Sequence, residues 1–280
     1  MMKNTPRQVG FGTLKRKDMD LSNTFAASAR IQSINHRVTK MKNKKIKPIF
    51  KSTTYNQNLI SWIIEEFPEN YTDLIYIDLF CDNIGVYLQK SKSKIEIIND
   101  SHEGIIQIYR AIKDEYKHFV KKINAVKCNS ETFEKFIASE GQKYEDYIEK
   151  AVNEFVLRKL SKAEGKKSFI DKKIKWDEII DESLAIRNRL QETFIMNKEA
   201  IEVIQKFNNH ESFIYCDLPI DLREQQYTKI TNLLNNFSGK VLITSKDQKI
   251  CKKYFVSWTC KRKMLQKNTK KKLECIWKNY

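Results

Sequence analysis

The sequence has little glycine and proline, with 7 and 4 residues in a chain of 280. This scarcity excludes collagen-like, elastic and proline-rich disordered proteins. No apolar run approaches the roughly 20 residues that span a bilayer, and residues 1–20 are too polar for a signal peptide. Hydrophobic residues nevertheless make up 41% of the chain, which is enough to bury a substantial core in one or two domains.

The sequence also lacks the usual metal and redox motifs. None of the six cysteines forms a C-x-x-C pair and the four histidines are dispersed, so we predict no metal site. Several cysteines lie in apolar runs, which predicts buried, reduced thiols. We therefore expect a cytoplasmic protein without membrane association. The abundance of Lys, Asn and Ile indicates that the gene comes from an AT-rich genome. We expect the protein to act in a bacterial cell or in a host cell infected by a phage.

Charge is distributed unevenly along the chain, which has a formal charge of +17. Residues 1–47 carry 12 Lys and Arg against 2 acids, and residues 261–280 carry 8 against 1, so the sequence between them is balanced. Basic ends on a neutral body are typical of proteins that bind nucleic acid or another polyanion. A lysine-rich coding bias is the alternative, but it does not explain why the body stays neutral.

Apolar periodicity begins after a polar, basic segment, residues 1–46, which we interpret as a flexible arm. From there strand and helix patterns alternate. Strands are predicted at 74–80, 94–99, 212–217, 240–245 and 273–278, and helices at 58–67, 103–120, 197–207 and 224–237. Residues 121–194 form a charged, helix-rich insertion. The alternation predicts an α/β fold whose core comprises residues 47–120 and 195–280.

Acidic residues follow three of the predicted strands. Asp78 begins an Asp-Leu-Phe-Cys-Asp-Asn segment, Asp100 follows Asn99, and Asp217 ends the third strand. In open α/β sheets, ligands bind at the carboxyl ends of the strands. Asp100 stands where nucleotide-binding folds place an acid for ribose hydroxyls. An acid at such a position is also a common turn or helix-cap residue, so each one alone is weak evidence.

Taken in order, these segments resemble the Dam-like family of adenine-specific DNA methyltransferases. The resemblance is collinear over residues 47–280 and rests on KPIFK at 47–51, FPENY at 67–71, DLF at 78–80, IEIIND at 95–100, EFVLRKLS at 154–161, FIYCD at 213–217 and LECIW at 273–277. It implies a Rossmann-like class I methyltransferase sheet that uses S-adenosylmethionine and acts on DNA. It also implies that the helical insertion, residues 121–194, is a target-recognition subdomain.

The resemblance assigns four residues to cofactor binding, namely Asp100 at the ribose, Phe80 and Asp82 in the first loop, and Glu199 at the adenine. The family's first loop has two glycines, which let the backbone approach the cofactor. The matching positions here are Asp82 and Ile84. Ile84 is unfavourable in a left-handed turn, and the Asp82 carboxylate would repel that of the cofactor. The family's opening Gly-Gly-Lys is replaced by residues 54–56, Thr-Tyr-Asn.

The family's catalytic motif, Asp-Pro-Pro-Tyr, corresponds here to Asp217, Leu218, Pro219 and Ile220. In the family, the Asp and the next carbonyl accept hydrogen bonds from the adenine amine, and the aromatic ring stacks on the flipped base. Leu218 does not fix the turn as proline does, and Ile220 has no aromatic face.

Changes in all three motifs predict a pseudo-methyltransferase that binds DNA and needs no cofactor. The basic candidates for DNA binding are Lys42, Lys44, Lys45, Lys47, Arg158, Lys159, Lys162, Lys166, Lys167, Lys261, Arg262 and Lys263. One alternative is an active adenine-specific methyltransferase with a divergent site that uses S-adenosylmethionine. Another is an inactive subunit or scaffold of a phage or mobile-element assembly, with the N-terminal arm bound to a protein partner.

Overall fold

The computed structural model describes residues 45–50, 57–140, 142, 144, 146–161, 168–171, 174–219, 222–245, 248–267 and 270–280. The predicted arm lies outside the described residues except for its last two positions. So do residues 54–56, Ile220 and five of the predicted DNA-binding lysines: Lys42, Lys44, Lys162, Lys166 and Lys167.

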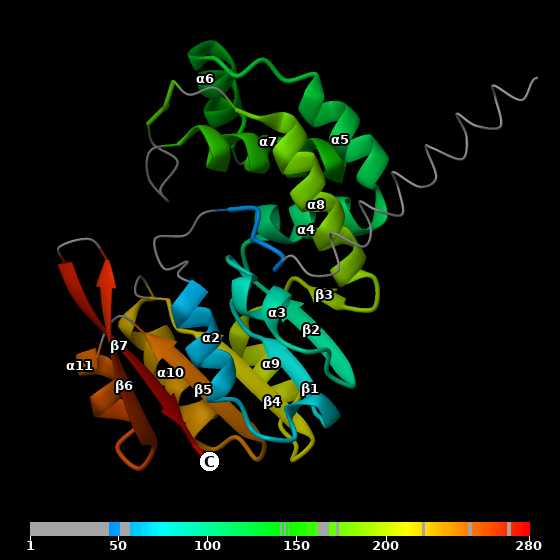
Figure 1. Cartoon of the computed structure of the whole chain (residues 1–280). Helices are drawn as coiled ribbons and strands as arrows, with labels where there is room; N and C mark the ends of the chain where they lie inside the picture. The colour runs from blue at the N-terminus through cyan, green and yellow to red at the C-terminus, as the bar shows by residue number, and fades with distance from the viewer. Residues whose placement is uncertain are drawn as a thin grey trace, which may run out of the picture. The chain divides into compact units, whose positions relative to one another are not determined.

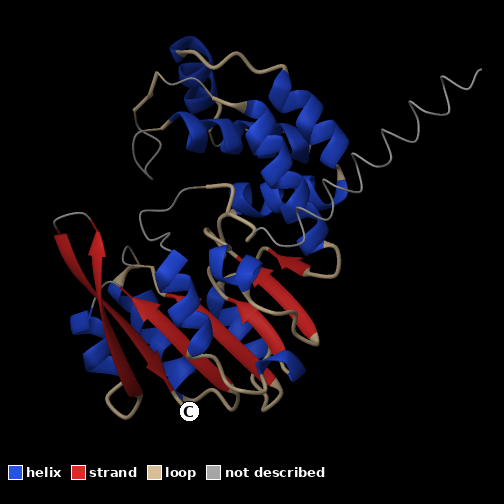
Figure 2. Ribbon diagram, in the orientation of Figure 1, coloured by secondary structure: helices blue, strands red, loops and turns tan. Residues whose placement is uncertain are grey.

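The described strands form one sheet in the order β3-β2-β1-β4-β5-β7-β6 (Figures 1 and 2). The strands are β1 (Ile75–Asp78), β2 (Ile95–Asn99), β3 (Phe194–Met196), β4 (Ser212–Asp217), β5 (Lys240–Ser245), β6 (Thr259–Lys267) and β7 (Lys270–Lys278). The strands from β1 to β5 are parallel, whereas β7 is antiparallel to both of its neighbours. This arrangement confirms the predicted class I methyltransferase sheet.

Both faces of the sheet are buried because successive strand residues alternate between two apolar clusters. Tyr76 and Phe213 belong to one cluster, and Ile77 and Ile214 belong to the other. The helices are α2 (Gln57–Glu65), α3 (Gly85–Gln89), α4 (Glu103–Asp114), α5 (Tyr116–Asn124), α6 (Ser130–Ala138), α7 (Tyr147–Leu160), α8 (Trp176–Leu190), α9 (Ala200–Lys206), α10 (Glu224–Asn235) and α11 (Gln248–Tyr254), with a short 3-10 helix, η1, at Tyr71–Asp73.

The predicted helix at 103–120 is two helices, so that prediction was wrong. The chain leaves helical geometry at Glu115, where φ is −122° and ψ is 37°. The second helix then places Phe119 against Phe155 of α7, with ring centroids 5.5 Å apart. In the sequence, helices α5 to α8 come between β2 and β3. In space they lie together and are joined to the sheet through α4 (Figure 2). Phe155 is fully buried and also contacts the rings of Phe50 and Trp176.

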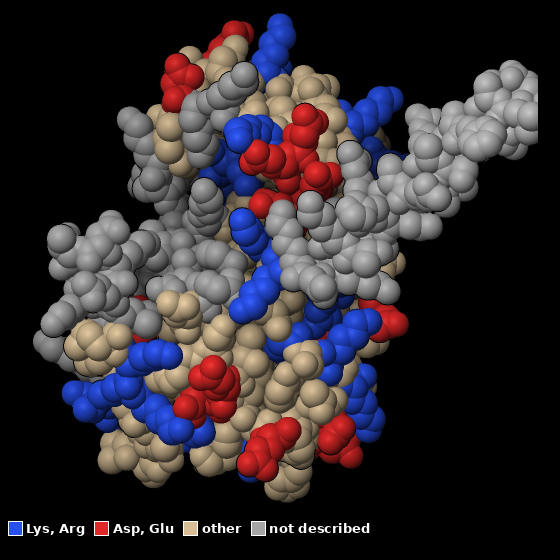
Figure 3. Space-filling model, viewed as in Figure 1, with Lys and Arg blue, Asp and Glu red and all other residues tan. Residues whose placement is uncertain are grey.

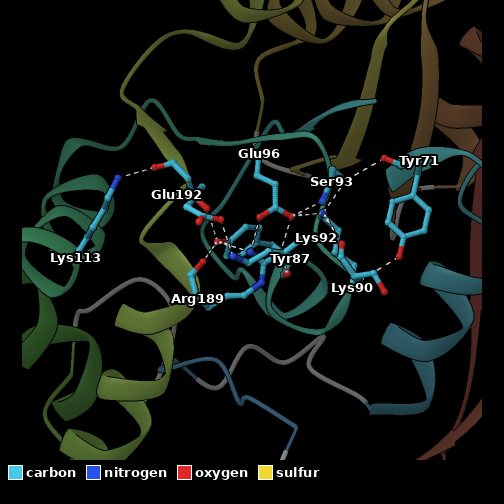
Figure 4. Close-up of polar contacts among 11 residues, drawn as sticks. Tyr71, Tyr87, Lys90, Lys92, Ser93, Glu96, Lys113, Arg189 and Glu192 are labelled. Carbon is cyan, nitrogen blue, oxygen red and sulfur yellow. Dashed lines mark hydrogen bonds and ion pairs between the residues drawn. The ribbon is translucent and has the colours of Figure 1, made fainter. Parts of the chain in front are cut away.

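A buried ionic network connects α8 to the sheet (Figure 4). Glu96 of β2 accepts a hydrogen bond from Arg189 of α8 at 2.7 Å and one from Lys90 at 2.5 Å, and all three side chains are buried. The Tyr87 hydroxyl lies 2.6 Å from the Thr193 hydroxyl and donates to the Arg189 carbonyl at 2.9 Å. The helical segment therefore returns to the sheet at a fixed point beside β2.

Candidate functional site

Three acids stand at the carboxyl ends of adjacent parallel strands. Asp78 ends β1, Asp217 ends β4 and Asp100 follows the last residue of β2. Because β1 lies between β2 and β4, the sheet brings the three acids to one edge. This is the edge at which open α/β sheets bind their ligands.

Asn99 joins the loops that leave this edge. Its side-chain amide donates to the carbonyls of Leu79 and Lys198, and its side-chain oxygen accepts from the Lys198 N–H at 3.1 Å. The backbone carbonyl of Asn99 accepts from the Cys81 N–H at 2.9 Å. A single buried amide thus holds the loops after β1 and β3 beside Asp100.

Burial makes this edge costly to ionise. Neither carboxylate oxygen of Asp78 has a hydrogen-bond partner among the described residues, and the side chain is fully buried. Burial, followed by the charges of Asp217 and Asp100, raises the pKa of Asp78 well above its usual value. Burial also raises the pKa of Asp100 to about 6, although its Oδ1 accepts a 2.8 Å hydrogen bond from the His102 N–H.

The first loop adopts ordinary backbone geometry despite its lack of glycines. Ile84 has φ −78° and ψ 24°, and its side chain is fully buried in the core. The expectation that Ile84 strains a left-handed turn was therefore wrong, since the residue does not adopt one. The Asn83 side-chain oxygen accepts a hydrogen bond from the Gly85 N–H at 2.9 Å, just before α3. The Ile84 side chain thus anchors the loop to the core.

Arg158 of α7 binds the first loop. Its Nη1 lies 2.7 Å from Asp82 Oδ1, and its Nε donates to Glu154 Oε1 at 2.6 Å. Burial lowers the pKa of Arg158, but the charges of Asp82 and Glu154 outweigh it and raise the pKa above its usual value. The Arg158 side chain is only 16% exposed, so it is engaged within the protein. The four-residue spacing to Glu154 is visible in the sequence, but the contact with Asp82 is not.

Lys159 is also held internally. Its ammonium donates to the Ile49 carbonyl and lies 5.5 Å from the ring centroids of Phe50 and Phe155. The structure therefore brings Arg158 and Lys159, both predicted as DNA contacts, into the interior face of α7.

The structure describes the segment that matches the family's catalytic motif from Asp217 to Pro219. Asp217 Oδ1 accepts a 2.9 Å hydrogen bond from the Thr244 hydroxyl of β5. The Leu218 N–H donates to the Thr244 carbonyl at 2.8 Å, and the Leu218 side chain is buried in the core. Burial of the side chain and this hydrogen bond fix the position of Leu218. Neither contact could be predicted from the sequence. Sequence reasoning missed Thr244, whose role depends on the pairing of β4 with β5.

The remaining predicted cofactor residues surround the same edge. Asn197 donates to the Asp100 carbonyl at 2.8 Å, which brings the loop after β3 next to β2. Glu199, two residues further on, is exposed and begins α9 without a side-chain capping bond. Phe80 is half-buried and packs against the apolar cluster that contains Ile77 and Ile214.

The space beside Asp217 is small. A cavity of about 40 Å³ lies there, lined by Leu59, Ile60, Ile63, Asn83, Gly85, Val86, Tyr215, Asp217, Thr244, Ser245, Glu274 and Cys275. Pockets for small molecules usually enclose roughly 300–1,000 Å³. Asp217 and Thr244 therefore border a cavity smaller than a typical small-molecule pocket. Asp82 and Ile84 hold the two positions that match the family's glycines; the Ile84 side chain is buried in the core and the Asp82 side chain is bound to Arg158.

The other predicted basic residues lie on the surface. Lys45 and Lys47 are exposed at the start of the described chain, and Arg262 is exposed on β6. Lys261 forms a 2.8 Å ion pair with Glu66, and the Lys263 ammonium lies 5.6 Å from the Trp62 ring centroid. Figure 3 shows basic side chains gathered over β6 and β7.

Neither a metal cluster nor a membrane-spanning helix is present in the described part of the chain. It holds no cluster of three or more His, Cys, Asp or Glu side chains suited to a metal ion. Its helices include none with the length and apolar character required to traverse a bilayer.

Three of the solved structures that this chain resembles share little sequence with it. A conserved hypothetical protein of Streptococcus pyogenes is 9% identical, with a TM-score of 0.38, and the match covers 79% of this chain and 94% of that one. A protein of Haemophilus influenzae assigned as a methylase is 9% identical, with a TM-score of 0.33 and coverage of 80% and 94%. A protein assigned as a methyltransferase and complexed with SAH is 11% identical, with a TM-score of 0.38 and coverage of 83% and 54%.

The family comparison is more decisive than these structural likenesses. No curated protein sequence matches the chain. The model of the D12 class N6 adenine-specific DNA methyltransferases matches residues 57–278, which span the whole described sheet. This chain therefore belongs to the D12 class N6 adenine-specific DNA methyltransferase family.

Proposed function

We propose that this chain is a DNA-binding member of its family that no longer transfers methyl groups. The observation that carries the proposal is the first loop after β1. Its two positions that correspond to glycines hold Ile84, buried in the core, and Asp82, bound to Arg158 at 2.7 Å. The family uses S-adenosylmethionine, and a loop held in this way offers it neither bare backbone nor space.

The altered catalytic motif supports the same proposal. Asp217 retains its carboxylate, and one of its oxygens already accepts from Thr244. Position 220 is isoleucine, which offers a flipped adenine no aromatic face, and such stacking contributes roughly 1–3 kcal/mol per base. Holding an extrahelical base would therefore be weaker here than in a site with tyrosine.

DNA binding is supported by the family and by the charge distribution. The family acts on duplex DNA, and residues 261–280 carry eight basic residues against one acid. Each Lys or Arg that contacts a phosphate releases counterions, which makes affinity depend steeply on salt. We expect micromolar or tighter duplex binding that weakens strongly between 50 and 200 mM salt, as is typical of proteins making roughly 6–10 phosphate contacts.

Methyl transfer by a divergent site is the second candidate function. It is favoured by one observation, the retention of Asp78, Asp100 and Asp217 at the same edge of the sheet. Asp78 is fully buried, and a cationic ligand that paired with its ionised form would offset part of the cost of that burial.

Three measurements on one preparation separate these functions. Calorimetric titration with S-adenosylmethionine should give no saturable heat, transfer of labelled methyl groups to an AT-rich duplex should stay at background, and the duplex should bind with salt-dependent affinity. Saturable cofactor binding that is lost in Asp100→Ala would contradict the proposal and favour the active enzyme. Absence of duplex binding by the folded protein would refute both functions and favour a scaffold.

A further inference from the structure

The hairpin of β6 and β7 extends past the edge of the sheet that carries Asp217. Asp217 pairs with Thr244 of β5. The next residue, Ser245, ends β5 and pairs with Cys275 of β7. From there, residues 263–267 and 270–274 continue as a two-stranded ribbon. At about 3.4 Å per residue, five residues project roughly 17 Å past the sheet. Figure 1 shows this hairpin rising beyond the neighbouring strands.

The ribbon is strongly basic. Strands β6 and β7 together contain eight Lys and Arg, and Glu274 is the one acid in their sequences. Lys261 and Lys278 form ion pairs with Glu66 at 2.8 and 3.0 Å, near the base of the ribbon. By sequence and register, Lys267 and Lys270–Lys272 stand beside the connection between the two strands.

An apolar pair lies within this basic ribbon. Met264 and Leu273 are directly opposite each other in the register, and 57% and 36% of their surfaces are exposed. Arg262, two residues before Met264 and so on the same face, is also exposed. Charged residues on an edge strand often serve only to prevent aggregation. Exposed Met264 and Leu273 would promote aggregation, so that role does not explain this surface. The combination suits a surface that binds both apolar and anionic groups.

Duplex DNA presents such groups together in its major groove. Thymine methyl groups line the groove floor and phosphates line its walls. The groove is about 12 Å wide and about 8.5 Å deep, and it admits a two-stranded ribbon. The strands of a ribbon lie about 4.8 Å apart, so a ribbon that projects from the sheet can lie along the groove with one face towards the base edges.

We propose that the β6–β7 ribbon enters the major groove of duplex DNA, with Met264 and Leu273 against base edges and Arg262 at a phosphate. The proposal rests on DNA binding as the proposed function and names the element that makes the contact. It requires no change in the fold, because the ribbon already projects on the side of the sheet where Asp217 lies.

Fluorescence anisotropy with a labelled AT-rich duplex tests the proposal. Met264→Ala combined with Leu273→Ala should weaken binding by about tenfold at fixed salt, with the salt slope unchanged because the lost contacts are apolar. Arg262→Gln should reduce the slope of log affinity against log salt by about 0.9, the value for one phosphate contact. Val256→Ala, at a residue 83% exposed elsewhere, and Lys229→Gln, on the exposed face of α10, are matched controls that should bind as the parent does.

The groove is tested with modified duplexes. A duplex whose cytosines carry glucose on a C5-hydroxymethyl group has a filled major groove and should bind at least about tenfold more weakly, whereas a minor-groove ligand should compete little. Unfolding curves of all variants should coincide with that of the parent. Equal affinity of the hairpin variants and the controls would overturn the inference while leaving the proposed function standing. Failure of the parent itself to bind any duplex would refute the proposed function.

Discussion

Removal of the Glu96 carboxylate should destabilise this protein strongly. The carboxylate accepts hydrogen bonds from Arg189, Lys90 and the Ser93 N–H, and both cations are buried. Glu96→Ala leaves the two cations in the interior without the acid that they share. Breaking a buried pair in this way costs about 3–5 kcal/mol. The loss is a large part of the roughly 5–15 kcal/mol by which domains are stable.

Lys90 gives this loss a characteristic pH dependence. Burial lowers the pKa of Lys90 to about 8, even with Glu96 beside it. Without Glu96 the pKa of Lys90 should fall further. At a pH between the pKa of Lys90 in the variant and its pKa in the parent, Lys90 is then protonated less in the folded variant than in the folded parent. The stability of the variant then rises relative to the parent with increasing pH. We expect the largest destabilisation near pH 6 and a smaller one at pH 8.

Urea denaturation at pH 6 and pH 8 measures both effects, provided that the dependence on urea concentration is unchanged. Glu192→Ala is the matched control, because the Lys92–Glu192 pair has side chains 57% and 77% exposed and such pairs contribute at most about 1 kcal/mol. A loss of less than about 1 kcal/mol for Glu96→Ala at pH 6, or equal losses for the two variants, would refute the reasoning.

Three further predictions concern the edge of the sheet. Because the pKa of Asp100 is raised to about 6, the parent gains stability as the pH falls through 6 towards 4. Asp100→Asn should therefore stabilise the protein by up to about 3 kcal/mol at pH 7 and have little effect at pH 4. Thermal melts at the two pH values measure this difference. Arg158→Gln should cost about 1.5–3 kcal/mol in urea titrations, because Asp82 and Glu154 each lose a charged hydrogen-bond donor, while duplex affinity should change less than about twofold. Leu218→Ala should cost about 2–5 kcal/mol by the same assay, since the side chain is buried.

The sequence predicted the interior of the sheet well because buried parallel strands carry continuous apolar runs. The segments Ser212–Asp217 and Lys240–Ser245 were predicted with the bounds that the structure shows. Strand β6 was missed for the opposite reason. Its sequence, TCKRKMLQK, has no apolar run, because it lies at the sheet edge and is ordered by backbone pairing with β7. Strand β3, with three residues, is too short to give a pattern.

At the site, the sequence indicated the acids but not their partners. Asp78, Asp100 and Asp217 could be placed together because each ends a strand. The pairing of Arg158 with Asp82 joins residues 76 positions apart and depends on how α7 packs, which local periodicity does not encode. Arg158, predicted from the sequence as a DNA contact, forms an ion pair with Asp82 that the sequence did not reveal.

The separation of charge along the molecule explains why DNA affinity should reside in the ribbon. The carboxyl edge of the sheet holds three acids, and a phosphate placed there would meet repulsion from each ionised carboxylate. The ribbon extends roughly 17 Å past this edge, which is about two Debye lengths at physiological salt, so phosphates beside its outer end are largely screened from the acids, whereas Arg262, level with Ser245, lies nearer to them. The uncharged face of a base is repelled by neither region. A duplex can therefore be held by its backbone at the ribbon while the edge of the sheet admits only a base, an arrangement that favours binding whether or not methyl transfer follows.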